Sequence, residues 1–216
     1  MEKNRQMNNF YTPNGISVYV KDPLTNNLDI EDIVSIVEER LPAKFLTEVE
    51  MIIVGQLEEF EDRQINAMYR DGCVYISNEQ DDADDLIDDI IHEISHSLEE
   101  PYGYEIYADK RMESEFLNKR RQLQKILWDH GYKTQLRFFL DTEYDTVFDN
   151  FLLNDVGYDK LSILAQGIFI SPYAATSLRE YFATGFTEFF MESDHNLLKS
   201  VSPVLYEKIK NLYLDD

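Results

Sequence analysis

His92-Glu93-Ile94-Ser95-His96 is an HExxH sequence near the C-terminal end of an amphipathic segment. The two histidines are four residues apart, so on a helix their imidazoles point the same way and both can bind one metal ion. Glu93 then lies close enough to that ion to accept a proton from metal-bound water. Only 4 histidines occur in the 216 residues, and two of them are in this motif. The pattern therefore predicts a catalytic metal site on a helix.

The residues around the motif predict the helix that carries it. Apolar side chains recur with helical spacing from residue 81 to residue 98 and form one broad face. The acidic run over 81–85 falls in the first turn, where carboxylates favour the positive end of the helix dipole. We prefer this explanation of the acidic run to a substrate-binding acidic patch.

The rest of the chain predicts an α+β protein with a small mixed sheet before this helix and a helical half after it. Residues 1–28 are rich in Asn, Pro and Thr and are expected to form an N-terminal extension, which leaves one domain over 29–216. Strand 73–77 follows the Asp71-Gly72 turn signal and is a candidate to pair with an extended substrate. The expected strands are 16–20, 49–54 and 73–77, and the expected helices are 32–41, 81–98, 104–130, 178–191 and 204–212, with one or two more within 133–166.

The charge of the chain limits its partners. A net charge of −22 argues against nucleic-acid binding and against adhesion to anionic membranes. It would favour cationic partners or substrates, although a solvated surface is the simpler explanation. The polar segment over 1–9 is not of signal-peptide type, and the sequence has no apolar run long enough for a membrane span. The expected location is the cytoplasm or a virion.

A catalytic zinc site needs a third protein ligand beside the two histidines of the motif. His130 and His195 lie near helix ends, where we expect polar caps. A carboxylate is the remaining option, and the chain has 42 of them, so the residues alone leave the ligand open. Glu180 is one candidate, but it lies opposite Phe182 and Phe186 on its helix, which predicts exposure to solvent.

The segment over 171–186, SPYAATSLREYFATGF, resembles the second signature of the anthrax lethal factor-like metallopeptidases, a group that includes the Pro-Pro endopeptidases. In that family a tyrosine precedes, by seven residues, a glutamate that opens an E-[FY]-F-A-x-x-F helix, and Tyr173 and Glu180 have this spacing. The resemblance implies a zincin-like metallopeptidase fold. It also implies Glu180 as the third zinc ligand beside His92 and His96, and Tyr173 as a residue that faces the substrate carbonyl.

The chain departs from the family pattern at several places. Ser95 stands where glycine is usual, and Thr184 stands where a second acidic residue is usual. The stretch between the two signatures is longer than the family norm, which implies a helical insertion at about 101–160. Gly185, inside a predicted helix, suggests that another helix approaches closely, and the helix with the HExxH motif is the expected neighbour.

The function that follows is zinc-dependent endopeptidase activity on a protein or peptide substrate. One Zn²⁺ ion would activate a water, Glu93 would be the general base, and Tyr173 would donate a hydrogen bond to the oxyanion. The alternative is a zincin-like structural or interaction component of a phage particle, docked on a larger assembly, with weak or no peptidase activity. The intact Glu93 favours catalysis, because a purely structural descendant need not keep it.

Overall fold

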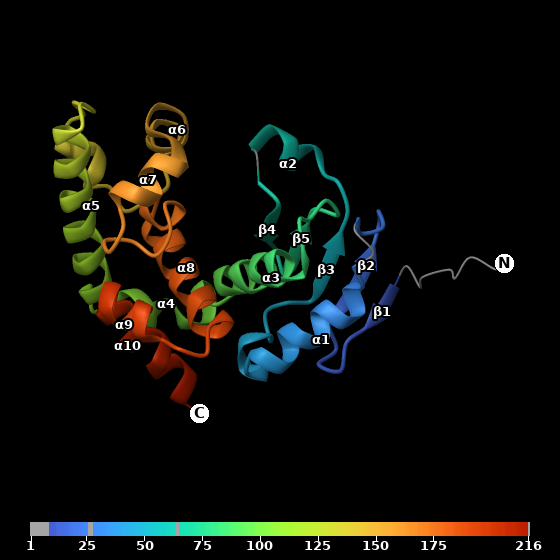
Figure 1. Ribbon diagram of the computed structural model, residues 1–216. Helices are drawn as coiled ribbons and strands as arrows, with labels where there is room; N and C mark the ends of the chain where they lie inside the picture. The colour runs from blue at the N-terminus through green and yellow to red at the C-terminus, as the bar shows by residue number, and fades with distance from the viewer. Residues whose placement is uncertain (1–8, 26–27, 64, 216) are drawn as a thin grey trace. The chain divides into compact units, whose positions relative to one another are not determined.

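The computed structural model describes residues 9–25, 28–63 and 65–215, which form an α+β protein (Figure 1). The chain divides into two compact units, and the division after Pro101 falls inside helix α4 (Glu99–Tyr107). We call the first the sheet unit and the second the helical unit. The segment expected as an insertion, about 101–160, makes up the first half of the helical unit.

One mixed five-stranded sheet forms the sheet unit. Its spatial order is β1, β2, β3, β5, β4; the outer pairs β1–β2 and β4–β5 are antiparallel, and the inner pairs β2–β3 and β3–β5 are parallel. Residues 9–20, expected in a peripheral extension, supply two of these strands; residues 1–8 and 26–27 of that extension lie outside the described residues. The strands are β1 (Asn9–Tyr11), β2 (Ser17–Val20), β3 (Met51–Val54), β4 (Ala67–Arg70) and β5 (Cys73–Ile76).

The turn between β4 and β5 confirms the hairpin expected at residues 71–72. Asp71 and Gly72 have φ values of 51° and 79°, the left-handed backbone that a tight type I′ turn requires. However, β5 lies between β3 and β4, so its backbone already pairs on both sides. The expectation that this strand pairs with a substrate is therefore wrong, and β4 is the strand at that edge of the sheet.

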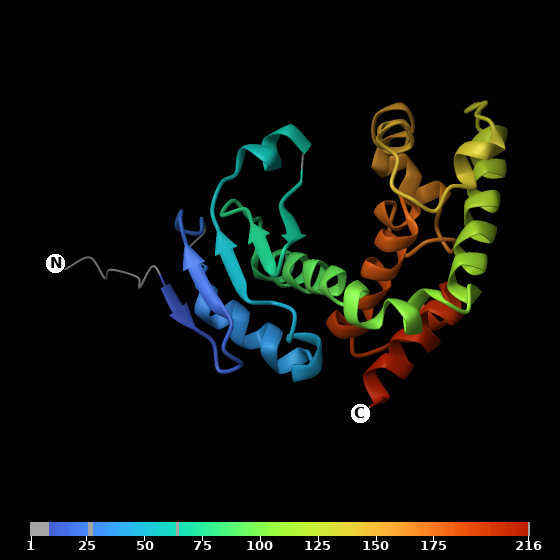
Figure 2. The same cartoon turned by 180° about the vertical axis from the view of Figure 1, so that it is seen from behind.

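Helices α1 (Ile30–Arg40) and α3 (Ala83–Ser97) pack against each other and cover one face of the sheet (Figures 1 and 2). The pairing register puts alternate strand residues on that face, and their side chains are buried. The helices expected over 32–41 and 81–98 are confirmed, and Asp29 is the N-cap of α1. The buried strand residues are Val18, Ile52, Val54, Val74 and Ile76.

The helical unit differs most from expectation around α4. Proline and glycine often end a helix, but α4 runs through Pro101 and Gly103. Pro101 occupies the first turn, where its missing N–H group removes no helix hydrogen bond. The single helix expected over 104–130 is broken at Lys110, which has a left-handed φ of 56°. No helix in the described part of the chain is long and apolar enough to cross a membrane.

Three long helices, α5 (Arg111–Asp129), α8 (Leu178–Met191) and α10 (Pro203–Leu214), pack on one another. The helix expected over 178–191 is confirmed. Glu115 of α5 accepts hydrogen bonds from the backbone N–H groups of Val204 and Leu205 and so caps α10. The shorter elements are the 3-10 helices η1 (Ala43–Phe45), η2 (Leu136–Phe139) and η4 (Tyr173–Ala175), the π-helix η3 (Phe151–Gly157), and the helices α2 (Glu58–Arg63), α6 (Thr146–Asn150), α7 (Tyr158–Leu164) and α9 (Asn196–Val201).

Gly185 lies at the contact between α8 and α10. A Cβ atom on this residue would overlap the side chain of Leu205, whose Cγ would be only 2.7 Å away. The expectation of a close approach is therefore right. The neighbour expected there, the helix with the HExxH motif, is wrong, because α10 takes that place.

Candidate metal centre

Helix α3 presents both histidines of the motif on adjacent turns. Asp82 begins the helix by accepting a hydrogen bond from the backbone N–H of Asp85. Buried isoleucines and leucines fix the rotation of the helix on the sheet, so the positions of the motif residues follow from the core. The rings of His92 and His96 lie with their centroids 5.2 Å apart at an interplanar angle of 74°.

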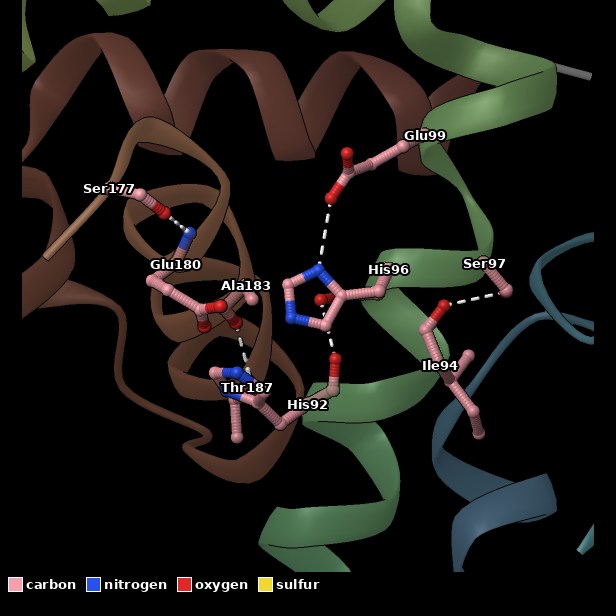
Figure 3. Close-up of polar contacts among 10 residues, drawn as sticks. His92, Ile94, His96, Ser97, Glu99, Ser177, Glu180, Ala183 and Thr187 are labelled. Carbon is pink, nitrogen blue, oxygen red and sulfur yellow. Dashed lines mark hydrogen bonds and ion pairs between the residues drawn. The ribbon is translucent and has the colours of Figure 1, made fainter. Parts of the chain in front are cut away.

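Glu99 orients the second histidine. Its Oε1 atom lies 2.9 Å from Nδ1 of His96 (Figure 3). A carboxylate at this distance favours a proton on Nδ1, which leaves the lone pair of Nε2 for a metal ion. Sequence reasoning did not single out Glu99, although its position one helical turn after His96 is a signal that could have found it.

Glu93 lies between the two histidines in the sequence and is buried, with 9% of its surface exposed. On a helix the side chain of Glu93 points to one side of that of His92 and not to the opposite face of the helix. A buried carboxylate next to two histidines that could bind a metal ion is suitably placed to take up a proton.

The start of helix α8 positions Glu180. Ser177 is its N-cap, and its Oγ atom accepts a hydrogen bond from the backbone N–H of Glu180 at 3.1 Å. Serine followed three residues later by glutamate is the capping-box pattern, a signal present in the sequence that was not used. Glu180 is half-buried, so the predicted exposure to solvent is only partly realised.

His92, His96 and Glu180 form a group that could hold a metal ion. One potential ligand atom from each of them lies within 4.8 Å of the others (Figure 3). Two imidazole nitrogens and one carboxylate oxygen are a donor set found in catalytic zinc sites, where the fourth position is left for water. The donor chemistry therefore fits zinc, and the hydrogen bond between His96 and Glu99 adds the outer support that such ligands usually have.

The other residues singled out by the sequence lie on helices of the helical unit or at their ends. Tyr173 opens the short helix η4, which packs on α8, and its role toward a substrate stays a prediction. Thr184, at the position of a usual acidic residue, is half-buried on α8. His130 and His195 behave as the expected caps and bond to backbone carbonyls of Ile126 and Phe189.

An acidic cavity of about 650 Å³ adjoins the first half of α3. Asp89, half-buried at its wall, accepts a hydrogen bond from Gln80 at 3.2 Å. Burial raises the pKa of Asp89 to about 6 against the opposing hydrogen bond, and the charges of Asp88 and Glu93 add to the rise. The cavity is lined by Thr25, Asn66, Glu79, Gln80, Asp81, Asp85, Asp88 and Asp89.

Asp89→Asn should raise the free energy of unfolding of the metal-free protein by about 1–3 kcal/mol near pH 8. The folded state binds the Asp89 proton up to about pH 6, whereas the unfolded chain releases it near 3.8, the ordinary pKa of an aspartate. Ionised Asp89 therefore destabilises the fold above this window, and the gain from asparagine should disappear as the pH falls below about 4. Urea unfolding across this pH range measures the effect. A gain that is equal at both ends of the range would contradict it, and Asp84→Asn, at an exposed position on α3, is the control.

No protein-family model, no curated protein and no solved structure matches the chain. The α+β fold and a group of His92, His96 and Glu180 that could hold a metal ion are established by the structure of the described residues.

Proposed function

We propose that the chain is a zinc-dependent endopeptidase with a zincin-like fold, similar to the lethal factor-like metallopeptidases. The observation that carries the proposal is the proximity of Glu180 to the two histidines of the HExxH motif, within 4.8 Å. These residues are far apart in the sequence, and the donor set that they form together is the one expected of a catalytic zinc site.

Zinc bound by His92, His96 and Glu180 would polarise a substrate carbonyl and lower the pKa of a water molecule toward neutrality. Glu93 would accept the proton of that water as its oxygen attacks the peptide carbonyl carbon, and would then pass the proton to the leaving amine. The phenol of Tyr173 would donate a hydrogen bond to the carbonyl oxygen as negative charge develops on it.

The substrate in this proposal is a protein or peptide, and the charge of the chain favours cationic side chains on it. The acidic cavity lies close to the motif along α3. Its lining residues Asp88 and Asp89 are one helical turn before His92 and Glu93. Strand β4, at the edge of the sheet and in contact with α3, could pair with an extended substrate in place of β5.

The test combines metal analysis with a cleavage assay. The purified protein should contain about one zinc ion per chain and should cleave members of a peptide library, and a chelator should stop cleavage until zinc is returned. Absence of bound metal would contradict the proposal at its root. Zinc without cleavage of any peptide or protein would favour the alternative, a structural component docked on a larger assembly.

A further inference from the structure

Two consecutive cations of helix α5 are buried in the helical unit. Lys119 is 6% exposed and Arg120 is 1% exposed. Their hydrogen bonds go to backbone carbonyl groups, and both cations also lie over aromatic rings. A buried charge without a carboxylate in hydrogen-bond contact is an expensive arrangement, and apolar side chains of similar size would usually stabilise a core as well or better.

Arg120 holds the backbone directly before helix α8. Its Nη1 atom donates to the carbonyl oxygens of Ala175 and Thr176 at 3.0 and 3.1 Å, and its Nη2 atom donates to that of Phe138 at 2.7 Å. The guanidinium carbon lies 3.9 Å from the ring centroid of Phe148. The planar fork of arginine reaches all three carbonyls from one rigid group, which a lysine ammonium on a flexible stem cannot do.

Lys119 holds the other end of the same segment. Its Nζ atom donates to the carbonyl oxygens of Ile168 and Val201, each at 2.5 Å. Burial lowers the pKa of Lys119 to about 8 and that of Arg120 to about 9, because the charged form of each side chain is less stable here than in water. The two side chains together fix the chain at residues 168 and 175–176.

The segment between these anchors contains Tyr173. Its carbonyl oxygen accepts hydrogen bonds from the backbone N–H and the hydroxyl of Thr176, the residue whose own carbonyl Arg120 holds. Tyr173 is therefore the first residue of a three-residue turn, and this turn is hydrogen-bonded to Thr176, which Arg120 holds. Glu180, by contrast, is on a long helix fixed by its own buried aromatic side chains.

We propose that Arg120 is a positioning residue, which holds the η4 turn so that the Tyr173 phenol is presented in one orientation to the substrate carbonyl. The inference rests on the proposed peptidase function and on the role of Tyr173 within it. Arg120 acts on the reaction only through the turn. Loss of its hydrogen bonds should therefore weaken oxyanion stabilisation without loss of the metal ion.

The test is a double-mutant cycle with Arg120→Lys and Tyr173→Phe. Arg120→Lys should lower kcat about 10-fold and leave KM and zinc content within about 2-fold of wild type. In the Tyr173→Phe background the same change should alter kcat by less than about 2-fold, because the group being positioned is already gone. Arg121→Lys is the matched control, since Arg121 is the next residue of α5 and is exposed. The positioning role would be overturned if the fold-losses in kcat of the two single variants multiplied in the double variant. An unchanged kcat in Arg120→Lys would overturn it as well.

Hydrogen exchange provides a readout that does not depend on activity. Amides of residues 173–178 should exchange faster in Arg120→Lys, while those of the α8 interior stay protected. If the lysine variant does not fold, Arg120→Gln, which removes the buried charge and keeps a donor, takes its place. Failure of the proposed function would show as a wild-type protein that cleaves nothing. Equal exchange of the turn in variant and wild type would instead overturn the anchoring itself.

Discussion

Replacement of Glu93 by alanine should lower kcat/KM for peptide cleavage by at least about 100-fold and leave the zinc content unchanged. Glu93 is the buried carboxylate of the motif, and the group that could hold the metal is made by His92, His96 and Glu180. Loss of the base removes the route by which a proton leaves the attacking water, whereas the ligands that hold the ion are untouched. Cleavage kinetics and metal analysis on the same preparation measure both effects.

Two further variants separate chemistry from packing. Glu93→Gln keeps the size and most of the hydrogen bonds of the side chain but cannot accept the proton, so it should be as inactive as the alanine variant. Asp84→Asn removes a carboxylate from an exposed position on the same helix and should leave activity near that of wild type. Activity of Glu93→Gln close to that of wild type would contradict the role of Glu93 as a base.

Helix α3 could be predicted from the sequence because its determinants are local. The apolar period, the acidic first turn and the spacing of His92 and His96 all lie within one segment, and α3 follows them. The strands β3 and β5 and the helix α8 were predicted for the same reason. The neighbours of a strand depend on contacts between distant segments. The inner position of β5 and the strand β1 were therefore missed, whereas β2 agrees with the strand expected over 16–20.

The helical unit was less predictable around residue 101. Pro101 and Gly103 are helix-ending signals in isolation, but Pro101 removes no hydrogen bond in the first turn of α4, and a glycine inside a helix costs only about 1 kcal/mol relative to alanine. Lys110, which breaks the expected long helix, gives no sequence signal for its left-handed backbone. The local propensities point in the wrong direction here, and packing decides the outcome.

The residues of the candidate site also differ in how far the local sequence could predict them. His92, His96 and their outer partner Glu99 lie within eight consecutive residues, so all three could be read from helix geometry. Glu180 could not, because no rule of spacing within the chain selects it among 42 acidic residues. The resemblance to a known signature singled it out, and the proximity of Glu180 to both histidines agrees with that choice. Arg120 had no signal at all, since a charged residue on a charged helix is expected in solvent.

Replacement of Glu180 by alanine should weaken zinc binding by more than about 100-fold, which exceeds the 10- to 100-fold loss typical of an outer hydrogen-bond partner. Glu180 contributes the oxygen donor of the group, and without it the two histidines of α3 hold the ion alone. Competition with a chromophoric chelator gives the zinc dissociation constant. Glu192→Ala, at the exposed C-terminal end of the same helix, is the control and should bind zinc as wild type does.

Comparison with Glu99→Ala distinguishes a direct zinc ligand from an outer hydrogen-bond partner. Glu99 contacts His96 and is not part of the group that could hold a metal ion, so its loss should weaken zinc binding within the 10- to 100-fold range. The expected order of zinc affinity is therefore wild type, then Glu99→Ala, then Glu180→Ala. If Glu180→Ala bound zinc as tightly as wild type, the third ligand would be another carboxylate. If the two variants exchanged places in this order, Glu99 would be the ligand and Glu180 the outer partner.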